Sequence, residues 1–173
     1  SSQGISVAVG ANVADISLDS SGARVTIMAS GEQMEVDCDV VLVAAGVQAN
    51  SDSLGLEQLG VATEKGFITV DSTMATNVSG VYAIGDVTGK LLLAHVASAQ
   101  GHYVAELIAG LNPECLDYQM MPRATYCNPQ VASFGLTETQ AREKGYSVKV
   151  GRFPFQANGK AHAIGEGVGM AKL

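Results

Sequence analysis

The stretch from Thr76 to Gly101, TNVSGVYAIGDVTGKLLLAHVASAQG, decides the fold of this chain. It predicts a short buried strand at 81–84, a tight Gly-Asp turn, a loop and an Ala-rich helix over 91–111. Asp86 stands where the strand ends. Because α/β proteins place nucleotide-contacting groups at the ends of their strands, Asp86 is the first candidate for a binding residue.

The composition bounds the class of protein. A length of 173 residues predicts one domain or parts of two. Apolar residues make up 47% of the chain and charged residues only 16%, which argues for a packed core and against disorder. The net charge of -7 argues against nucleic acid as a partner, because little here would neutralise phosphates.

The sequence predicts no membrane span, since its longest apolar run, Val40 to Val47, is interrupted by Gly46 and falls short of about 20 residues. The start, Ser1-Ser-Gln-Gly4, lacks the basic and apolar regions of a signal peptide. We therefore expect a reducing, cytoplasmic compartment. A location inside an organelle stays open, because a transit peptide would lie upstream.

The three cysteines are widely spaced and show neither metal nor redox spacing. We expect Cys38, Cys115 and Cys127 to act as small buried hydrophobic residues, and we predict no metal site.

Alternating apolar residues predict a β-meander in the first quarter of the chain, with turns at 19–22 and 30–32. The expected strands are 5–7, 11–18, 24–29, 35–37 and 40–44. The last of these is apolar on both faces, which is typical of a buried strand.

After a polar connection at 49–65, a strand is expected at 67–70, and a boundary near 119–122. The capping box Thr137-Glu-Thr-Gln140 predicts a helix at 138–144. Further short strands are expected at 124–127, 131–134, 148–153 and 167–173. Because the chain stops inside the last of them, we expect Leu173 to be a truncation point.

Asp86 has two interpretations. An aspartate in a turn often hydrogen-bonds its own backbone. Alternatively, its carboxylate accepts hydrogen bonds from the hydroxyls of a sugar-like chain, since a carboxylate is acceptor-only and holds two donors. Gly85 would then let the bound chain approach the backbone closely.

The pattern T-x-x-x-x-V-Y-A-I-G-D from Thr76, with Leu-Leu-Ala-His six to nine residues after the Asp, resembles the second FAD-binding motif of the pyridine nucleotide-disulfide oxidoreductases. The resemblance covers nearly the whole chain. It implies that Asp86 binds the flavin ribityl chain. It also implies that four residues at a helix N-terminus line the isoalloxazine ring, where the helix dipole stabilises a reduced, anionic flavin: Leu92, Leu93, Ala94 and His95.

Other motifs resemble the dihydrolipoamide dehydrogenase branch of that family. Leu93-Ala-His-Val-Ala97 resembles the sequence of that branch at the flavin site, and Phe153-Pro-Phe155 resembles part of its interface domain. Val43-Ala-Ala-Gly46 resembles the end of the NAD domain, where the matching glycine contacts NAD. Here Val47-Gln-Ala49 replaces the Arg-x-Pro that usually follows, and a simple strand-end turn at Gly46 stays open.

The resemblance implies an α/β and α+β fold in three parts. Residues 1–46 would end a Rossmann-like NAD-binding domain, 47–120 would form the C-terminal part of an FAD-binding domain, and 121–173 would begin a truncated α+β dimerisation domain. The implied cofactors are FAD and NAD. The implied partners are a second copy of the chain, the lipoamide substrate and components of an α-keto acid dehydrogenase complex.

The family's chemistry also needs a C-x-x-x-x-C disulfide and a His-Glu base, which this sequence does not contain. We therefore assign no catalytic residue here and expect the chain alone to be inactive. His102 and His162 are expected to have surface or packing roles. Two alternatives stay open: another disulfide or mercuric reductase of the same family, or a non-catalytic flavin-binding module.

Overall fold

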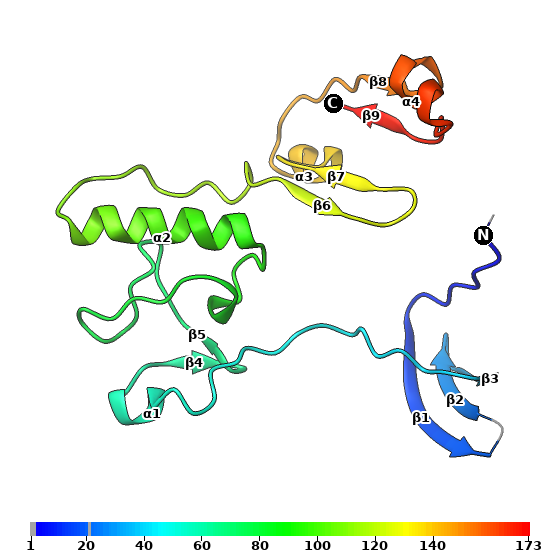
Figure 1. Cartoon of the computed structure of the whole chain (residues 1–173), viewed down its shortest axis with the longest axis horizontal. Helices are drawn as coiled ribbons and strands as arrows, with labels where there is room; N and C mark the ends of the chain where they lie inside the picture. Colours follow the sequence, from blue (N-terminus) through cyan, green and yellow to red (C-terminus); the bar gives the residue numbers. More distant parts are fainter. Residues whose placement is uncertain (1–2, 21) are drawn as a thin grey trace. The chain divides into compact units, whose positions relative to one another are not determined.

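The computed structural model describes residues 3–20 and 22–173. The chain folds as two compact units, residues 1–47 and 48–173 (Figure 1). Ser1 and Ser2, which belong to the segment examined for a signal peptide, lie outside the described residues. So does Ser21, which belongs to the expected turn at 19–22.

The first unit is an antiparallel meander of three strands in the order β1-β2-β3, as predicted. β1 (Ala11–Asp19) pairs with β2 (Gly22–Ala29), which pairs with β3 (Glu32–Cys38). The register aligns Ile16, Val25 and Val36, so one apolar row crosses the sheet. The segment 5–7 was expected to be a strand and is irregular instead.

The prediction of a buried strand at 40–44 is wrong. These residues form no strand, and Val40, Leu42 and Val43 are 80%, 87% and 77% exposed. An apolar strand is stabilised by the neighbours that take its backbone hydrogen bonds on both sides. Within the described residues no strand pairs with this segment, so its backbone lacks the neighbouring strands that would make it a strand.

The second unit opens with small elements that precede one long helix in the sequence. α1 (Leu56–Leu59) precedes the hairpin of β4 (Thr63–Glu64) and β5 (Phe67–Ile68), and a 3-10 turn, η1 (Asp86–Thr88), precedes α2 (Ala94–Ile108). The predicted helix is confirmed with tighter bounds. The strand predicted at 81–84 is reduced to a single bridge between Tyr82 and Ala75.

Two apolar clusters support this unit. Val61, Ile68 and Ala83 form one, close to the hairpin. Met74, Tyr103 and Val104 form the other, against one face of α2. Within α2, Val96 and Gln100 are 0% and 1% exposed, so the buried face of the helix includes one polar side chain.

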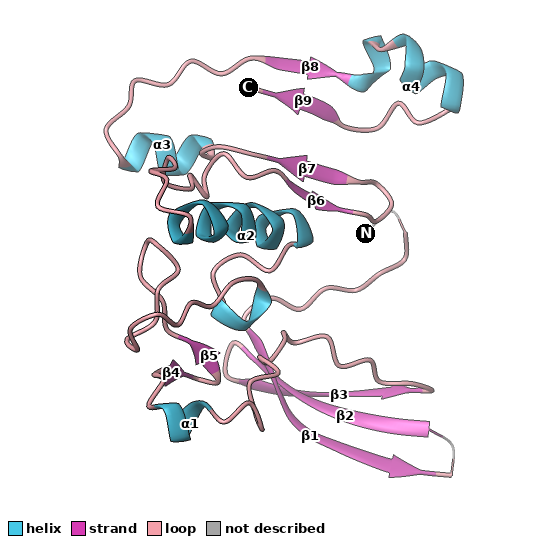
Figure 2. Ribbon diagram, turned by 60° about the vertical axis from the view of Figure 1, so that its left-hand side comes forward, coloured by secondary structure: helices cyan, strands magenta, loops and turns pink. Residues whose placement is uncertain are grey.

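The C-terminal part carries two hairpins and two short helices (Figure 2). The expected capping box is present, since Thr137 and Gln140 exchange hydrogen bonds of 3.0 and 3.2 Å. α4 was not predicted, although the side chain of Asn158 caps it by accepting from the Ala161 amide at 3.1 Å. The elements are β6 (Arg123–Thr125) paired with β7 (Val131–Ser133), α3 (Glu138–Glu143), β8 (Arg152–Pro154) paired with β9 (Met170–Lys172), η2 (Phe155–Ala157) and α4 (Gly159–Ile164).

Glu138 joins α3 to the β8–β9 hairpin. Its carboxylate lies 2.8 Å from Lys172 Nζ, 3.0 Å from Arg142 Nη2 and 3.7 Å from Arg152 Nη2. The hydrogen bond from Lys172, followed by that from Arg142, lowers the pKa of Glu138 to about 2 from its usual 4.5. One carboxylate therefore holds cations from three separate segments.

We expect Glu138→Gln to loosen the β8–β9 hairpin, because all three ion pairs lose their anion. Since the pKa of Glu138 is lower in the folded than in the unfolded chain, its stabilising effect is complete above pH 4.5 and disappears as the pH falls to about 2. Hydrogen exchange at the Gly151 and Leu173 amides, which bond each other's carbonyls at 2.9 and 3.0 Å, would report the change.

Glu143→Gln is the matched control, because Glu143 ends the same helix and has no ion pair among the described residues. Equal exchange rates in the two variants would show that the Glu138 ion pairs contribute nothing to the hairpin.

Gly89 separates η1 from α2 and meets the ring of Phe67. It has φ +67°, and a Cβ there would lie 2.9 Å from Phe67 Cγ and Cδ1. We expect Gly89→Ala to destabilise the unit by about 1–3 kcal/mol, through backbone strain and the clash together. Gly110→Ala is the control, since φ is +77° there and no atom lies within 4 Å of the added Cβ.

Urea denaturation of both variants would separate the two effects. If Gly89→Ala cost no more than Gly110→Ala, the approach of Phe67 to Gly89 would have no influence on stability.

Candidate functional site

The turn that carries Asp86 is held by hydrogen bonds to Gly85. Gly85 has φ 78° and ψ -160°, a conformation that an L side chain rarely adopts. Its carbonyl accepts from the Thr88 amide at 3.0 Å and from Thr88 Oγ1 at 2.8 Å. Its amide donates to Gln100 Oε1 at 2.6 Å. The backbone that leads into Asp86 is therefore held in place by these hydrogen bonds.

The carboxylate of Asp86 is exposed and accepts no hydrogen bond from residues 3–20 and 22–173. Two other aspartates show what a turn aspartate looks like in this chain. Asp71 Oδ1 accepts from the Thr73 amide and hydroxyl at 2.7 Å each and from the Ala75 amide at 3.1 Å. Asp117 accepts from the Gln119 amide at 2.9 Å. The backbone-bonded interpretation of Asp86 is thus not what the structure shows.

The start of α2 is uncapped. Leu93, the N-cap residue, is extended and offers no side-chain acceptor, and the first turn has no acidic residue. The Leu93 carbonyl accepts from Val96 and Ala97 at 3.0 Å each. The amides of Ala94 and His95 have no acceptor among the described residues. An electron-rich group would be favoured beside them.

The turn and the helix lie against each other. A Cβ built on Gly85 would be 3.4 Å from Ala97 Cβ, and one built on Gly101 would be 3.4 Å from Ile84 Cδ1. The structure therefore brings Asp86 and the expected wall residues 92–95 to the same part of the second unit.

His95 is tied to the chain beyond α2. Its Nε2 lies 2.9 Å from the Pro122 carbonyl. Because a carbonyl only accepts, Nε2 carries the proton in this bond. The ring is therefore held in place by a backbone group, which suits a wall residue better than a free base. His162 likewise bonds a backbone carbonyl, that of Gln156.

Gly46 is the remaining candidate site residue. It belongs to the first unit, is exposed and has φ +127°. No atom lies within 4 Å of the place where its Cβ would be. The turn interpretation and the NAD interpretation of Gly46 both remain predictions.

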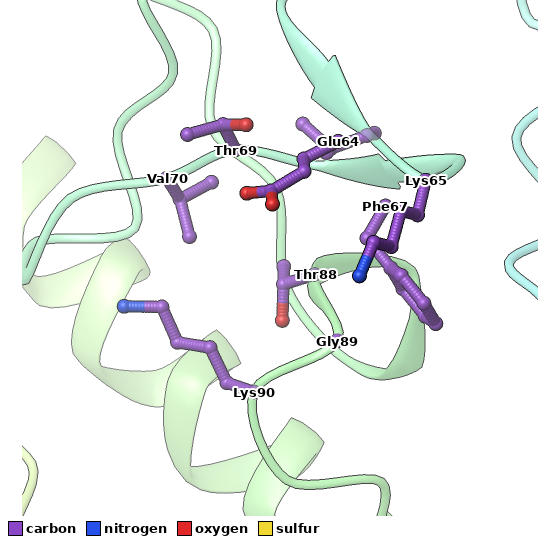
Figure 3. A pocket seen from close by; sticks show the side chains of 9 residues that line it. Glu64, Lys65, Phe67, Thr69, Val70, Thr88, Gly89 and Lys90 are labelled. Atoms are coloured by element: carbon purple, nitrogen blue, oxygen red, sulfur yellow. The ribbon is translucent and has the colours of Figure 1, made fainter.

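A hollow of about 280 Å³ borders the end of the turn, where Thr88 and Gly89 line it. Figure 3 shows Glu64, Thr69, Thr88 and Lys90 around it. Lys90 Nζ also donates to the Asp71 carbonyl at 3.0 Å and lies 5.9 Å from the centre of the Tyr118 ring. The lining includes neither Asp86 nor any of residues 92–95, so this hollow is not the site that the motif predicts.

Sequence reasoning missed two polar residues that shape the site, Thr88 and Gln100. A signal for Gln100 was present. It follows Val96 by four positions and precedes Tyr103 by three, so it falls on the apolar face of the helix. A polar residue in such a row needs a buried partner.

Comparisons with known proteins identify the family of the chain. The model of the family described as pyridine nucleotide-disulphide oxidoreductase matches residues 1–101, and that of its dimerisation domain matches 121–173. The chain belongs to this family. The predicted fold class and the resemblance on which it rested are confirmed.

Two of the similar curated proteins are named dihydrolipoyl dehydrogenase. A dihydrolipoyl dehydrogenase from Mycobacterium leprae is 52% identical over 98% of this chain and 37% of its own length. One from Corynebacterium glutamicum is 56% identical over 78% of this chain and 30% of its own. The chain thus spans about a third of the length of the curated relatives it matches.

Solved structures show the same fold. LpdA from Mycobacterium tuberculosis gives a TM-score of 0.81 at 26% identity, covering 94% of this chain and 35% of that one. The HOCl-induced flavoprotein disulfide reductase RclA from Escherichia coli gives 0.79 at 29%, covering 93% and 37%.

Within residues 3–20 and 22–173, no helix is long and apolar enough to cross a bilayer, and no three His, Cys, Asp or Glu side chains gather as metal ligands would.

The contrast between the aspartates can be tested without any ligand. We expect Asp71→Asn to destabilise the protein, because the hydrogen bonds from Thr73 lower the pKa of Asp71 and favour its charged form. Asp86→Asn should change the free energy of unfolding by less than about 0.5 kcal/mol, since its carboxylate has no internal partner. Urea denaturation of the flavin-free protein checks both, and an equal loss in the two variants would restore the structural interpretation of Asp86.

Proposed function

We propose that the whole protein is a dihydrolipoamide dehydrogenase, which passes electrons from dihydrolipoamide through a disulfide and FAD to NAD. The observation that carries the proposal is the exposed, unbonded carboxylate of Asp86 beside the uncapped start of α2. The names of the relatives in Mycobacterium leprae and Corynebacterium glutamicum support it.

The described residues fit FAD. The Asp86 carboxylate is an acceptor-only group with both oxygens open, as two ribityl hydroxyls require. Leu92, Leu93, Ala94 and His95 would form the wall of the ring, with the amides of Ala94 and His95 facing its electron-rich edge. FAD, when bound, supplies the two-electron carrier between a disulfide and a nicotinamide.

In this proposal the chain's own residues bind and orient but do not react. Asp86 fixes the ribityl chain, and the His95 ring is kept in position because its Nε2 proton is held by the Pro122 carbonyl at 2.9 Å. Gly46 would contact NAD through its backbone. No catalytic residue is assigned to this chain.

The organisation follows the same proposal. Residues 1–46 end an NAD-binding domain, 47–120 belong to the FAD-binding domain and 121–173 begin the dimerisation domain. A homodimer is proposed because the dimerisation model matches 121–173. A cytoplasmic location, the lipoamide substrate and association with an α-keto acid dehydrogenase complex complete the proposal.

A second candidate is another flavoprotein disulfide reductase of the family. The likeness to RclA, with a TM-score of 0.79 over 93% of this chain, favours it. The two candidates share the flavin site and differ in the substrate that reduces the disulfide.

The test uses the full-length protein. We expect it to purify with bound FAD and to reduce NAD with dihydrolipoamide, whereas the 173-residue chain alone should not. Asp86→Asn should weaken FAD binding roughly 10- to 100-fold, because hydrogen bonds to a charged group are worth about 1.5–3 kcal/mol. FAD titration of the apoprotein measures this.

Asp52→Asn is the control, since Asp52 is also exposed in the second unit and has no partner among the described residues. FAD binding by Asp86→Asn as tight as that of the control would refute the flavin assignment. A flavoprotein that reduces NAD only with another disulfide's dithiol form would favour the second candidate.

A further inference from the structure

Most of the buried polar side chains of the described residues form hydrogen bonds to Gly85. Among the described residues, the buried polar side chains are Ser51, Thr88 and Gln100. Two of these three bond Gly85: Thr88 its carbonyl and Gln100 its amide. The peptide groups on both sides of Gly85 are thus fixed from inside the protein.

The bonds form a chain with one direction. The Gly85 amide can only donate, so the oxygen of the Gln100 side chain must face it, at 2.6 Å. The Nε2 of Gln100 then faces Tyr118 and donates to its hydroxyl at 2.9 Å. That hydroxyl donates in turn to Met74 Sδ at 3.6 Å. Both ends of the Gln100 amide are satisfied at 1% exposure.

The position of Asp86 depends on this chain. Its carboxylate has no bond of its own to the described residues, so nothing but the backbone sets its direction. The residue before it is a glycine, which adopts many conformations unless it is held. Thr88 and Gln100 remove that freedom.

We propose that Gln100 is the positioning residue of the flavin site: by accepting the Gly85 amide it orients the Ile84–Gly85 peptide, which leads into Asp86, so that the carboxylate meets the ribityl hydroxyls. The inference rests on the flavin assignment of Asp86 proposed above and deepens it. Tyr118 is the second link, which holds the Gln100 side chain in place.

The proposal makes the acceptor oxygen at position 100 the decisive atom. Gln100→Met keeps the length and the apolar contacts but offers no such oxygen. Gln100→Glu keeps the oxygen, and its second oxygen can accept from Tyr118. Tyr118→Phe leaves the bond to Gly85 intact. Val104→Ala, one turn along the same helix, disturbs the core without touching the turn.

The experiment measures FAD affinity and the visible flavin spectrum of the full-length protein. We expect Gln100→Met to weaken FAD binding about tenfold or more and to shift the spectrum, because the Gly85 amide is left buried and unpaired. Gln100→Glu should stay within about threefold of the parent. Tyr118→Phe should fall between the parent and Gln100→Met, because Gln100 Nε2 loses its acceptor while the bond to Gly85 remains. Val104→Ala should lower the melting temperature and leave FAD affinity unchanged.

The outcomes separate this inference from the proposed function. Parental FAD binding by Gln100→Met, with loss in Asp86→Asn, would overturn the role of Gln100 and leave the flavin site standing. Parental binding by Asp86→Asn would overturn the proposed function itself. Loss in Gln100→Glu as large as in Asp86→Asn would also overturn the role of Gln100.

A measurement on the unchanged protein covers the case in which Gln100→Met does not fold. The inference requires the Gly85 amide to exchange slowly with solvent in the flavin-free protein, as slowly as the amides of the α2 interior. Rapid exchange at Gly85 would overturn it.

Discussion

The hydrogen bond from the Gly85 amide to Gln100 Oε1, 2.6 Å long, is the constraint on which the second unit depends. It fastens the end of the segment 81–84 to the buried face of α2, although that segment has only one bridge to hold it as a strand. The apolar clusters stabilise the unit through burial, which does not set the orientation of the turn. A hydrogen bond has a preferred geometry and does set it. The cost of burying Gln100 is therefore offset by its hydrogen bonds to Gly85 and Tyr118, and the first of these also orders the turn.

In the rest of the chain, regular structure depends on whether the hydrogen-bond partners of a segment are close in sequence. Where the hydrogen-bond partner of a segment lies nearby in sequence, as in the β1–β2–β3 meander or in α2, the structure is regular. Where it does not, apolar segments stay open, as at Leu42, which is 87% exposed. The chain covers about a third of its relatives' length. Exposed apolar residues are what a part of a larger core displays.

Features with local sequence signals were predicted correctly, whereas features set by partners distant in sequence were not. The capping box at Thr137 and the helical spacing of α2 are local signals, and both were confirmed. The strand at 40–44 failed because burial on both faces depends on neighbours that its own residues do not specify. The family was identified correctly from the motif around Asp86. Gln100 escaped notice because its partners, Gly85 and Tyr118, lie 15 and 18 positions away and are set by packing.

The bond between the His95 ring and the Pro122 carbonyl spans 27 positions of the chain. It closes the whole of α2 and the following connection into a loop whose two ends cannot drift apart. Pro122 is the second residue of the segment that matches the dimerisation domain. The first turn of α2 is therefore tied to the beginning of the dimerisation segment. A displacement of that segment would either break this hydrogen bond or move the His95 ring with it.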